Sequence, residues 1–118
     1  MTENIIQIKS YDFALKVVKF VQLLQSEQKE YILSKQLLRS ATSVGANVEE
    51  SIWGISHADF TSKIHIAYKE ARETHYWLRL IHDSGYMSDE MFTNFLSDNE
   101  EILRILGAII RTWKNAKN

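Results

Sequence analysis

One apolar repeat constrains this chain more than any other feature. Between residues 60 and 81, apolar or small side chains recur at alternating spacings of four and three: Phe60, Ile64, Ala67, Ala71, Thr74, Leu78 and Ile81. An average spacing of 3.5 residues keeps these side chains on one face of an α-helix. Sustained over about three heptads, the repeat predicts left-handed, near-parallel packing against neighbouring helices.

The part of the chain before this repeat predicts two helices. We expect the first to begin at Ser10, a good N-cap residue, and to bury one apolar stripe. Residues 1–9 have no clear period and are predicted to form an N-terminal tail. The second helix is expected to begin at Leu33 or Ser34 and to stop at Gly54.

The rest of the chain predicts two more helices. Ser56 opens a capping box in front of the heptad repeat, and Gly85 supplies the residue that ends that helix. The last helix is expected to open at Ser88. Four amphipathic helices with short connections, within one domain of residues 1–118, predict an all-α, antiparallel, up-down-up-down, left-handed four-helix bundle.

The second predicted helix contains residues that favour helices poorly. Its apolar stripe passes through a run of weak helix formers: Ser40, Thr42, Ser43, Val44, Gly45 and Asn47. Together they disfavour the helix by on the order of 3 kcal/mol relative to alanine. Packing must therefore hold this segment helical. Ala41 and Gly45 lie four residues apart on one face, and this small pair predicts the close approach of a neighbouring backbone.

Large side chains outside the heptad repeat predict a second buried face on the third helix. Besides Ile66, they are Tyr68, Tyr76, Trp77 and Leu80. A helix with apolar residues on more than one face is usually buried on more than one face. This face either covers a loop or tail of the same chain or contacts another subunit. Because Tyr and Trp are common at interfaces, we predict a subunit interface.

A basic row on the same helix is a candidate for contact with nucleic acid or another partner. Its members recur at steps of seven, with one lysine nearby: His65, Arg72, Arg79 and Lys69. Such a row could track phosphates. The alternative is a solvated face that Glu70 and Glu73 partly neutralise. With 14 basic and 15 acidic residues, the chain has no global attraction to nucleic acid, so any binding needs a local patch.

The sequence lacks the patterns that are typical of catalysis and metal binding. No Glu-x-x-His motif occurs, no two histidines are three or four apart, and there is neither a cysteine nor a Gly-rich phosphate loop. We therefore expect no enzyme, no cofactor and no bound metal.

One polar set nevertheless allows three interpretations. Its members are Arg39, Asn47, Glu50 and Glu73. We predict a buried hydrogen-bond network that sets the helix register. The alternatives are a catalytic carboxylate pair, or a small-ligand or metal site in the polar core of the bundle.

The sequence gives no sign of membrane insertion or export. No apolar run approaches the roughly 20 residues that span a bilayer. The N-terminus lacks the basic start and apolar core of a signal peptide, and the chain contains no cysteine. We expect the protein to be cytoplasmic and to have no membrane partner.

Two segments resemble a known family. The first is Leu37–Glu50 (LLRSATSVGANVEE), and the second joins Asp59-Phe60 to Ala67–Leu80 (AYKEARETHYWLRL). Together they closely resemble the bacterial four-helix-bundle proteins encoded in intervening sequences of 23S ribosomal RNA genes. The resemblance extends from about residue 10 to residue 111.

This resemblance implies a bundle that assembles into a ring, expected to be a pentamer. The family's biochemical role is unsettled. A related branch, the accessory proteins of diversity-generating retroelements, forms a basic pentameric barrel associated with reverse transcriptase and RNA. This chain departs from that branch in its nearly neutral charge. Taken together, membership of this family and likeness to this branch would imply a non-enzymatic scaffold or adaptor, with RNA or an RNA-handling protein as its partner.

Overall fold

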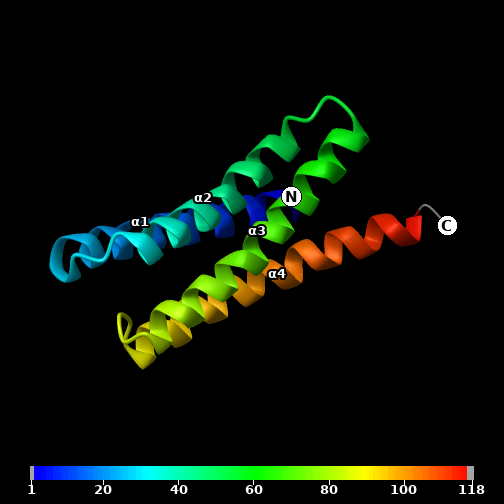
Figure 1. Ribbon diagram of the computed structural model, residues 1–118. Helices are drawn as coiled ribbons and strands as arrows, with labels where there is room; N and C mark the ends of the chain where they lie inside the picture. Colours follow the sequence, from blue (N-terminus) through cyan, green and yellow to red (C-terminus); the bar gives the residue numbers. More distant parts are fainter. Residues whose placement is uncertain (1, 117–118) are drawn as a thin grey trace.

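A computed structural model describes the backbone of residues 2–116 and the side chains of residues 5–114. Within this range it contains four helices and no strand: α1 (Thr2–Gln28), α2 (Ile32–Ile52), α3 (His57–Asp83) and α4 (Asp89–Ala116). Successive helices run antiparallel and are joined by short turns (Figure 1). The bundle measures 49 × 23 × 22 Å. The predicted all-α four-helix bundle is confirmed.

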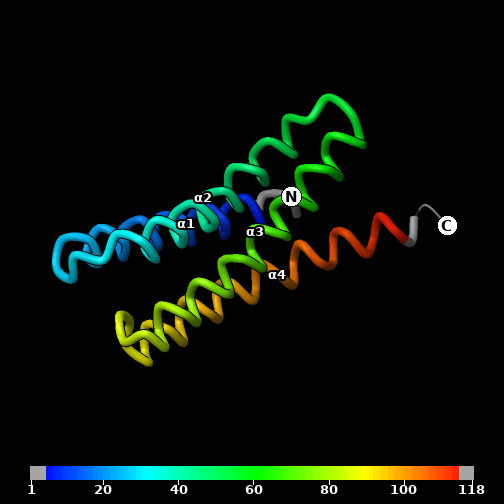
Figure 2. Tube along the Cα trace, in the orientation of Figure 1, coloured from blue at the N-terminus to red at the C-terminus, as the bar shows by residue number. Residues whose placement is uncertain are grey.

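Neighbours in the chain are also neighbours in space. Figure 2 shows the α1–α2 and α3–α4 turns toward one end of the bundle and the α2–α3 turn toward the other. Helix α3 packs most extensively against α2, and it also packs along α4. The contact between α1 and α4 is the smallest of these helix–helix contacts. Helices α3 and α4, which are consecutive in the chain, therefore form one helical hairpin.

The heptad repeat forms the inner face of α3, as predicted. Its members from Ile64 to Ile81 are buried. The Ser56 hydroxyl accepts a hydrogen bond from the Asp59 backbone N–H at 3.1 Å, which caps the first turn. Gly85 lies just after the end of α3 with a φ of 90°, in the left-handed region that favours glycine.

The predicted N-terminal tail is wrong, because α1 begins at Thr2 rather than at Ser10. Ile6 is only 2% exposed and joins the core. Ser10 is also buried and lies inside the helix, where it continues the stripe from Ile6 to Phe13 at spacings of four and three. A polar residue at this position interrupted the apolar pattern and therefore resembled an N-cap in the sequence.

Small side chains let α2 pack closely on both sides. Gly45 lies against the backbone of Ser10 in α1, so the close approach predicted for this residue involves α1. On the other side, the Thr74 hydroxyl of α3 donates a hydrogen bond to the Ser40 hydroxyl at 2.9 Å, and both residues are fully buried. These contacts explain how a segment of weak helix formers remains helical.

The first turn of α2 is capped by an acidic side chain from the preceding loop. The Glu30 carboxylate accepts hydrogen bonds from the backbone N–H groups of Ile32, Leu33 and Ser34 at 2.7–3.1 Å. Burial raises the pKa of this carboxyl, but the hydrogen bonds from backbone N–H groups outweigh that effect and lower its pKa below the ordinary value. Glu30 thus satisfies helix-end donors that Tyr31 leaves unpaired.

Length and hydropathy together decide whether a helix can cross a bilayer. None of the helices in the described residues is both long and apolar enough to do so.

Candidate functional site

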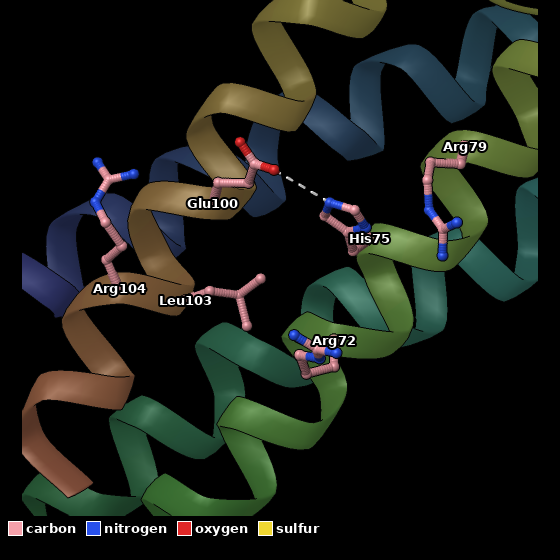
Figure 3. A pocket seen from close by; sticks show the side chains of 6 residues that line it. All are labelled: Arg72, His75, Arg79, Glu100, Leu103 and Arg104. Atoms are coloured by element: carbon pink, nitrogen blue, oxygen red, sulfur yellow. Dashed lines mark hydrogen bonds and ion pairs between the residues drawn. The ribbon is translucent and has the colours of Figure 1, made fainter. Parts of the chain in front are cut away.

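A concave surface rich in arginine lies between α3 and α4. We call it the α3–α4 hollow; its volume is about 560 Å³. It is lined by three residues from each helix: Arg72, His75 and Arg79, and Glu100, Leu103 and Arg104. In Figure 3, the two α3 arginines stand on one side of the hollow and Arg104 on the other. Charged groups from two helices thus meet around one depression.

A polar contact between the two helices joins two residues that line the hollow. His75 Nε2 and Glu100 Oε2 are 3.3 Å apart, and Figure 3 marks this contact with a dashed line. Leu103, beside them, packs against the hydrophobic core. Glu100 is the only carboxylate among the lining residues, and it is already engaged with His75.

The three arginines of the hollow differ from most charged residues at the other helix contacts. Among the described residues, no carboxylate lies within ion-pair distance of Arg72, Arg79 or Arg104. By contrast, cations elsewhere pair with acids across helices: Lys9 with Glu101, Lys16 with Asp98, and Lys63 with Glu50. The positive charge of these three arginines is therefore not offset by ion pairs within the described residues, although the net charge of the chain is -1.

The structure divides the predicted basic row. Arg72 and Arg79 line the hollow, whereas His65 and Lys69 are exposed on α3 outside it. The His65 ring nitrogen Nδ1 instead lies 2.9 Å from the Thr61 carbonyl oxygen of its own helix.

Four residues of the hollow were not predicted from the sequence. On α3 the residue is His75, and on α4 they are Glu100, Leu103 and Arg104. Arg104 directly follows Leu103 on α4, which shows that it flanks the apolar stripe. This signal identifies a flank of α4 but not the α3 residues opposite it, because that pairing depends on the relative register of the two helices.

The predicted interface residues of α3 have different environments. The Tyr68 ring packs over α4, where a β-carbon on Gly107 would be 3.7 Å from Tyr68 Cε1. Trp77 is half-buried, and its Nε1–H donates a hydrogen bond to Glu73 at 2.9 Å. Tyr76 is 49% exposed, while Leu80 is half-buried. Tyr76 is therefore the member of this set most available to a partner.

Another set of exposed apolar residues lies on α1. Ile8, Tyr11 and Leu15 follow one another at helical spacing on the face opposite the core, and 58%, 64% and 44% of their surfaces are exposed. We call these three residues the α1 outer stripe. We predicted one buried stripe on this helix from the sequence and did not predict this exposed one, although its spacing is visible there.

A second, apolar hollow of about 700 Å³ lies at the end of the bundle that holds the α2–α3 turn. Its principal apolar lining residues are Ile5, Ile52, Phe60, Ile105, Ile109 and Trp113. In the adjacent turn, Trp53 and Ile55 are almost fully exposed, at 79% and 96%. This end of the molecule therefore presents both an apolar depression and apolar projections.

The predicted buried polar network is wrong, because none of its members is buried and only Arg39 and Glu73 pair with each other. Arg39 pairs with Glu73 and Glu70 of α3 while remaining about half exposed. Asn47 donates to the Ser43 carbonyl oxygen of its own helix at 2.9 Å. Arg39 and Glu73 therefore pair at the solvent-accessible edge of the α2–α3 contact, and Asn47 bonds within α2.

Glu50 contacts neither Asn47 nor Glu73; its carboxylate pairs with Lys63 at 2.7 Å. The carboxylates Glu50 and Glu73 are thus held by different cations. Within the described part of the chain, no group of three or more histidine, aspartate or glutamate side chains is arranged to hold a metal ion. The geometry therefore gives no support to a site built from Asn47, Glu50 and Glu73.

Comparisons with known proteins agree with this architecture. The family model of the 23S rRNA-intervening sequence protein matches residues 2–108. A crystal structure of a protein of unknown function from the S23 ribosomal protein family of Bacteroides thetaiotaomicron VPI-5482 is similar, with a TM-score of 0.91 and 43% identity. The match covers 94% of this chain and 99% of that chain. The comparison with curated proteins finds no match.

Proposed function

This chain belongs to the 23S rRNA-intervening sequence protein family, and on that premise we propose that it is a non-enzymatic, ring-forming scaffold or adaptor of the cytoplasm. The ring is a pentamer, and each subunit binds RNA, free or held by an RNA-handling protein, at the α3–α4 hollow. The observation that carries the RNA assignment is the convergence of Arg72, Arg79 and Arg104 from two helices around one depression.

Exposed apolar surface supports the assembly part of this proposal. The three apolar side chains of the α1 outer stripe are exposed to water. Trp53 and Ile55 of the α2–α3 turn are exposed as well. Large contiguous apolar patches on soluble proteins commonly mark protein–protein contacts. The stripe and the turn are different surfaces of one chain. Contacts between different surfaces of identical subunits generate rings when the rotation closes.

The charge distribution supports the RNA part. Arginine is suited to phosphate recognition because its planar guanidinium donates several hydrogen bonds and stays protonated. Arg72 and Arg104 approach the hollow from opposite helices, so a phosphate chain that follows the groove would meet cations on both sides. Nearly neutral overall charge does not oppose this assignment, because binding depends on the local field within about a Debye length, on the order of 10 Å.

The RNA assignment is tested by the salt dependence of binding. Phosphate contacts release counterions, so affinity should fall linearly with salt on logarithmic axes. We expect the Arg72→Ala/Arg104→Ala variant to weaken binding and to reduce that slope by about 1 for each arginine removed. Lys35→Ala is the matched control, because Lys35 is an exposed cation on α2, away from the hollow. An affinity that neither salt nor the double substitution changes would remove RNA from the proposal.

A further inference from the structure

Tyr76 presents an exposed aromatic ring beside the α3–α4 hollow. About half of its surface is accessible, and it lies one helical turn from Arg72 along α3. The guanidinium carbon of Arg79, which lines the hollow, stands over the Tyr76 ring at 5.9 Å from its centroid. The exposed ring of Tyr76 and the guanidinium plane of Arg79 therefore lie next to each other at the hollow.

The orientation of this ring is supported from the side of α2. Trp77 packs edge-on against Tyr76, with ring centroids 5.0 Å apart and an interplanar angle of 73°. Trp77 in turn donates its Nε1–H to Glu73, and Glu73 pairs with Arg39 of α2. Because these contacts already restrict the ring, little conformational entropy remains to be lost when a ligand stacks on it.

Aromatic rings and guanidinium planes are the groups on which proteins stack unpaired bases. In duplex RNA the faces of the bases are covered by their neighbours, and a protein meets mainly phosphates and 2′-hydroxyls. An aromatic ring would add little to binding a duplex. The pairing of Tyr76 with the arginines is thus suited to a strand whose bases are free.

Resting on the RNA-binding function proposed above, we propose that the α3–α4 hollow is specific for single-stranded RNA. Phosphates lie between Arg72 and Arg104, and an unpaired base stacks at Tyr76 and Arg79. Four residues separate Arg72 from Tyr76, a rise of about 6 Å along the helix axis. One nucleotide can therefore contact the arginine with its phosphate and the tyrosine with its base.

The test compares one labelled RNA strand of unstructured sequence, free and annealed to its complement, at a fixed salt concentration. Fluorescence anisotropy gives the affinity of the full chain for each form. We expect the wild-type protein to bind the free strand more tightly. Tyr76→Ala should weaken binding of the free strand by roughly 5- to 150-fold, which corresponds to the loss of one stacked base. Binding of the duplex should change little, and Tyr76→Phe should retain the preference.

Each contrary outcome has a distinct meaning. Equal affinity of the wild-type protein for strand and duplex would overturn the specificity and leave the proposed RNA function intact. An equal loss of both affinities in Tyr76→Ala would also overturn it, because the residue would then support the hollow without contacting a base. Absence of binding to either RNA would overturn both proposals. The mass of Tyr76→Ala in solution shows whether this residue instead lies in a subunit interface.

Discussion

A β-carbon placed on Gly45 would lie 3.4 Å from the carbonyl oxygen of Ser10. This distance is an ordinary van der Waals contact, so the two backbones approach as closely as one added methyl group allows. Both residues are buried, and neither α1 nor α2 has a bulky side chain at this point. The contact therefore sets the separation of the first helical hairpin.

Substitutions at Gly45 should separate the effect of helix propensity from that of space. Gly45→Ala fits the available distance and should leave stability unchanged or raise it by up to about 1 kcal/mol, because alanine favours the helix. Gly45→Leu must push α1 away and should lower stability by about 1–3 kcal/mol or more. Urea unfolding of both variants measures these changes. A Gly45→Leu variant as stable as the wild type would show that the helices can separate without cost.

The buried hydrogen bond between Ser40 and Thr74 should make a measurable contribution to stability. A double-mutant cycle with Ser40→Ala and Thr74→Val is expected to give a coupling energy of about 0.5–1.5 kcal/mol, the net value of such a bond. Thr93→Val serves as a control, because Thr93 is exposed and bonds only to its own helix, so its effect should stay within about 0.5 kcal/mol. Additive effects of the two core substitutions would mean that the bond contributes nothing to stability.

The α3–α4 turn should become less stable as the pH rises. His82 Nε2 lies 2.7 Å from Asp89, and Nδ1 lies 3.0 Å from Asp83. Its hydrogen bonds, first with Asp89 and then with Asp83, raise the pKa of His82 above its ordinary value of 6.5. A raised pKa in the folded state adds stability that is complete below the unfolded pKa and is lost as pH rises through the folded one.

Proton NMR of the His82 ring, with thermal unfolding from about pH 5 to pH 9, follows this titration. Asp89→Asn should move the pKa of His82 back toward its ordinary value and flatten the pH dependence. An unchanged His82 titration in Asp89→Asn would contradict the assigned cause.

Much of this fold follows from the spacing of apolar residues. The repeat from Phe60 to Ile81, the cap at Ser56 and the turn at Gly85 could all be predicted, because each depends on residues close together in the chain. The start of α1 could not, because a buried serine and an N-cap serine look alike in sequence. Only the packing of Ser10 against Gly45 distinguishes them.

The candidate site was predicted in part for a related reason. Arg72 and Arg79 share a face of one helix, so their spacing placed them together. Arg104 and the contact between His75 and Glu100 depend on the register of α4 against α3. The prediction for the polar set around Asn47 was wrong, because Asn47 bonds to its own helix and Glu50 pairs with Lys63.

Glu100 should weaken RNA binding at the hollow, because its carboxylate faces the same space as the arginines. Glu100→Gln removes this negative charge and is expected to raise RNA affinity, with the largest gain at low salt. Glu101→Gln is a matched control on the next residue, whose carboxylate pairs with Lys9 toward α1. Equal effects of the two substitutions on affinity would show that the response reflects net charge and not the hollow.

The assembly surface should lie on the outer face of α1. Tyr11→Glu/Leu15→Glu places two charges on the α1 outer stripe, and we expect this variant to dissociate at concentrations where the wild type remains assembled. Both positions face solvent within the subunit, so far-UV circular dichroism should show the helical bundle retained. An assembled double variant would exclude α1 from the interface.

The mass of the wild-type protein in solution tests the central claim most directly. Size-exclusion chromatography with multi-angle light scattering at micromolar concentration should give about five times the subunit mass of 13.8 kDa. The same mass should persist after nuclease treatment, because the ring is held by protein surfaces. A single species of 13.8 kDa under these conditions would contradict the account of this protein as a ring-forming scaffold.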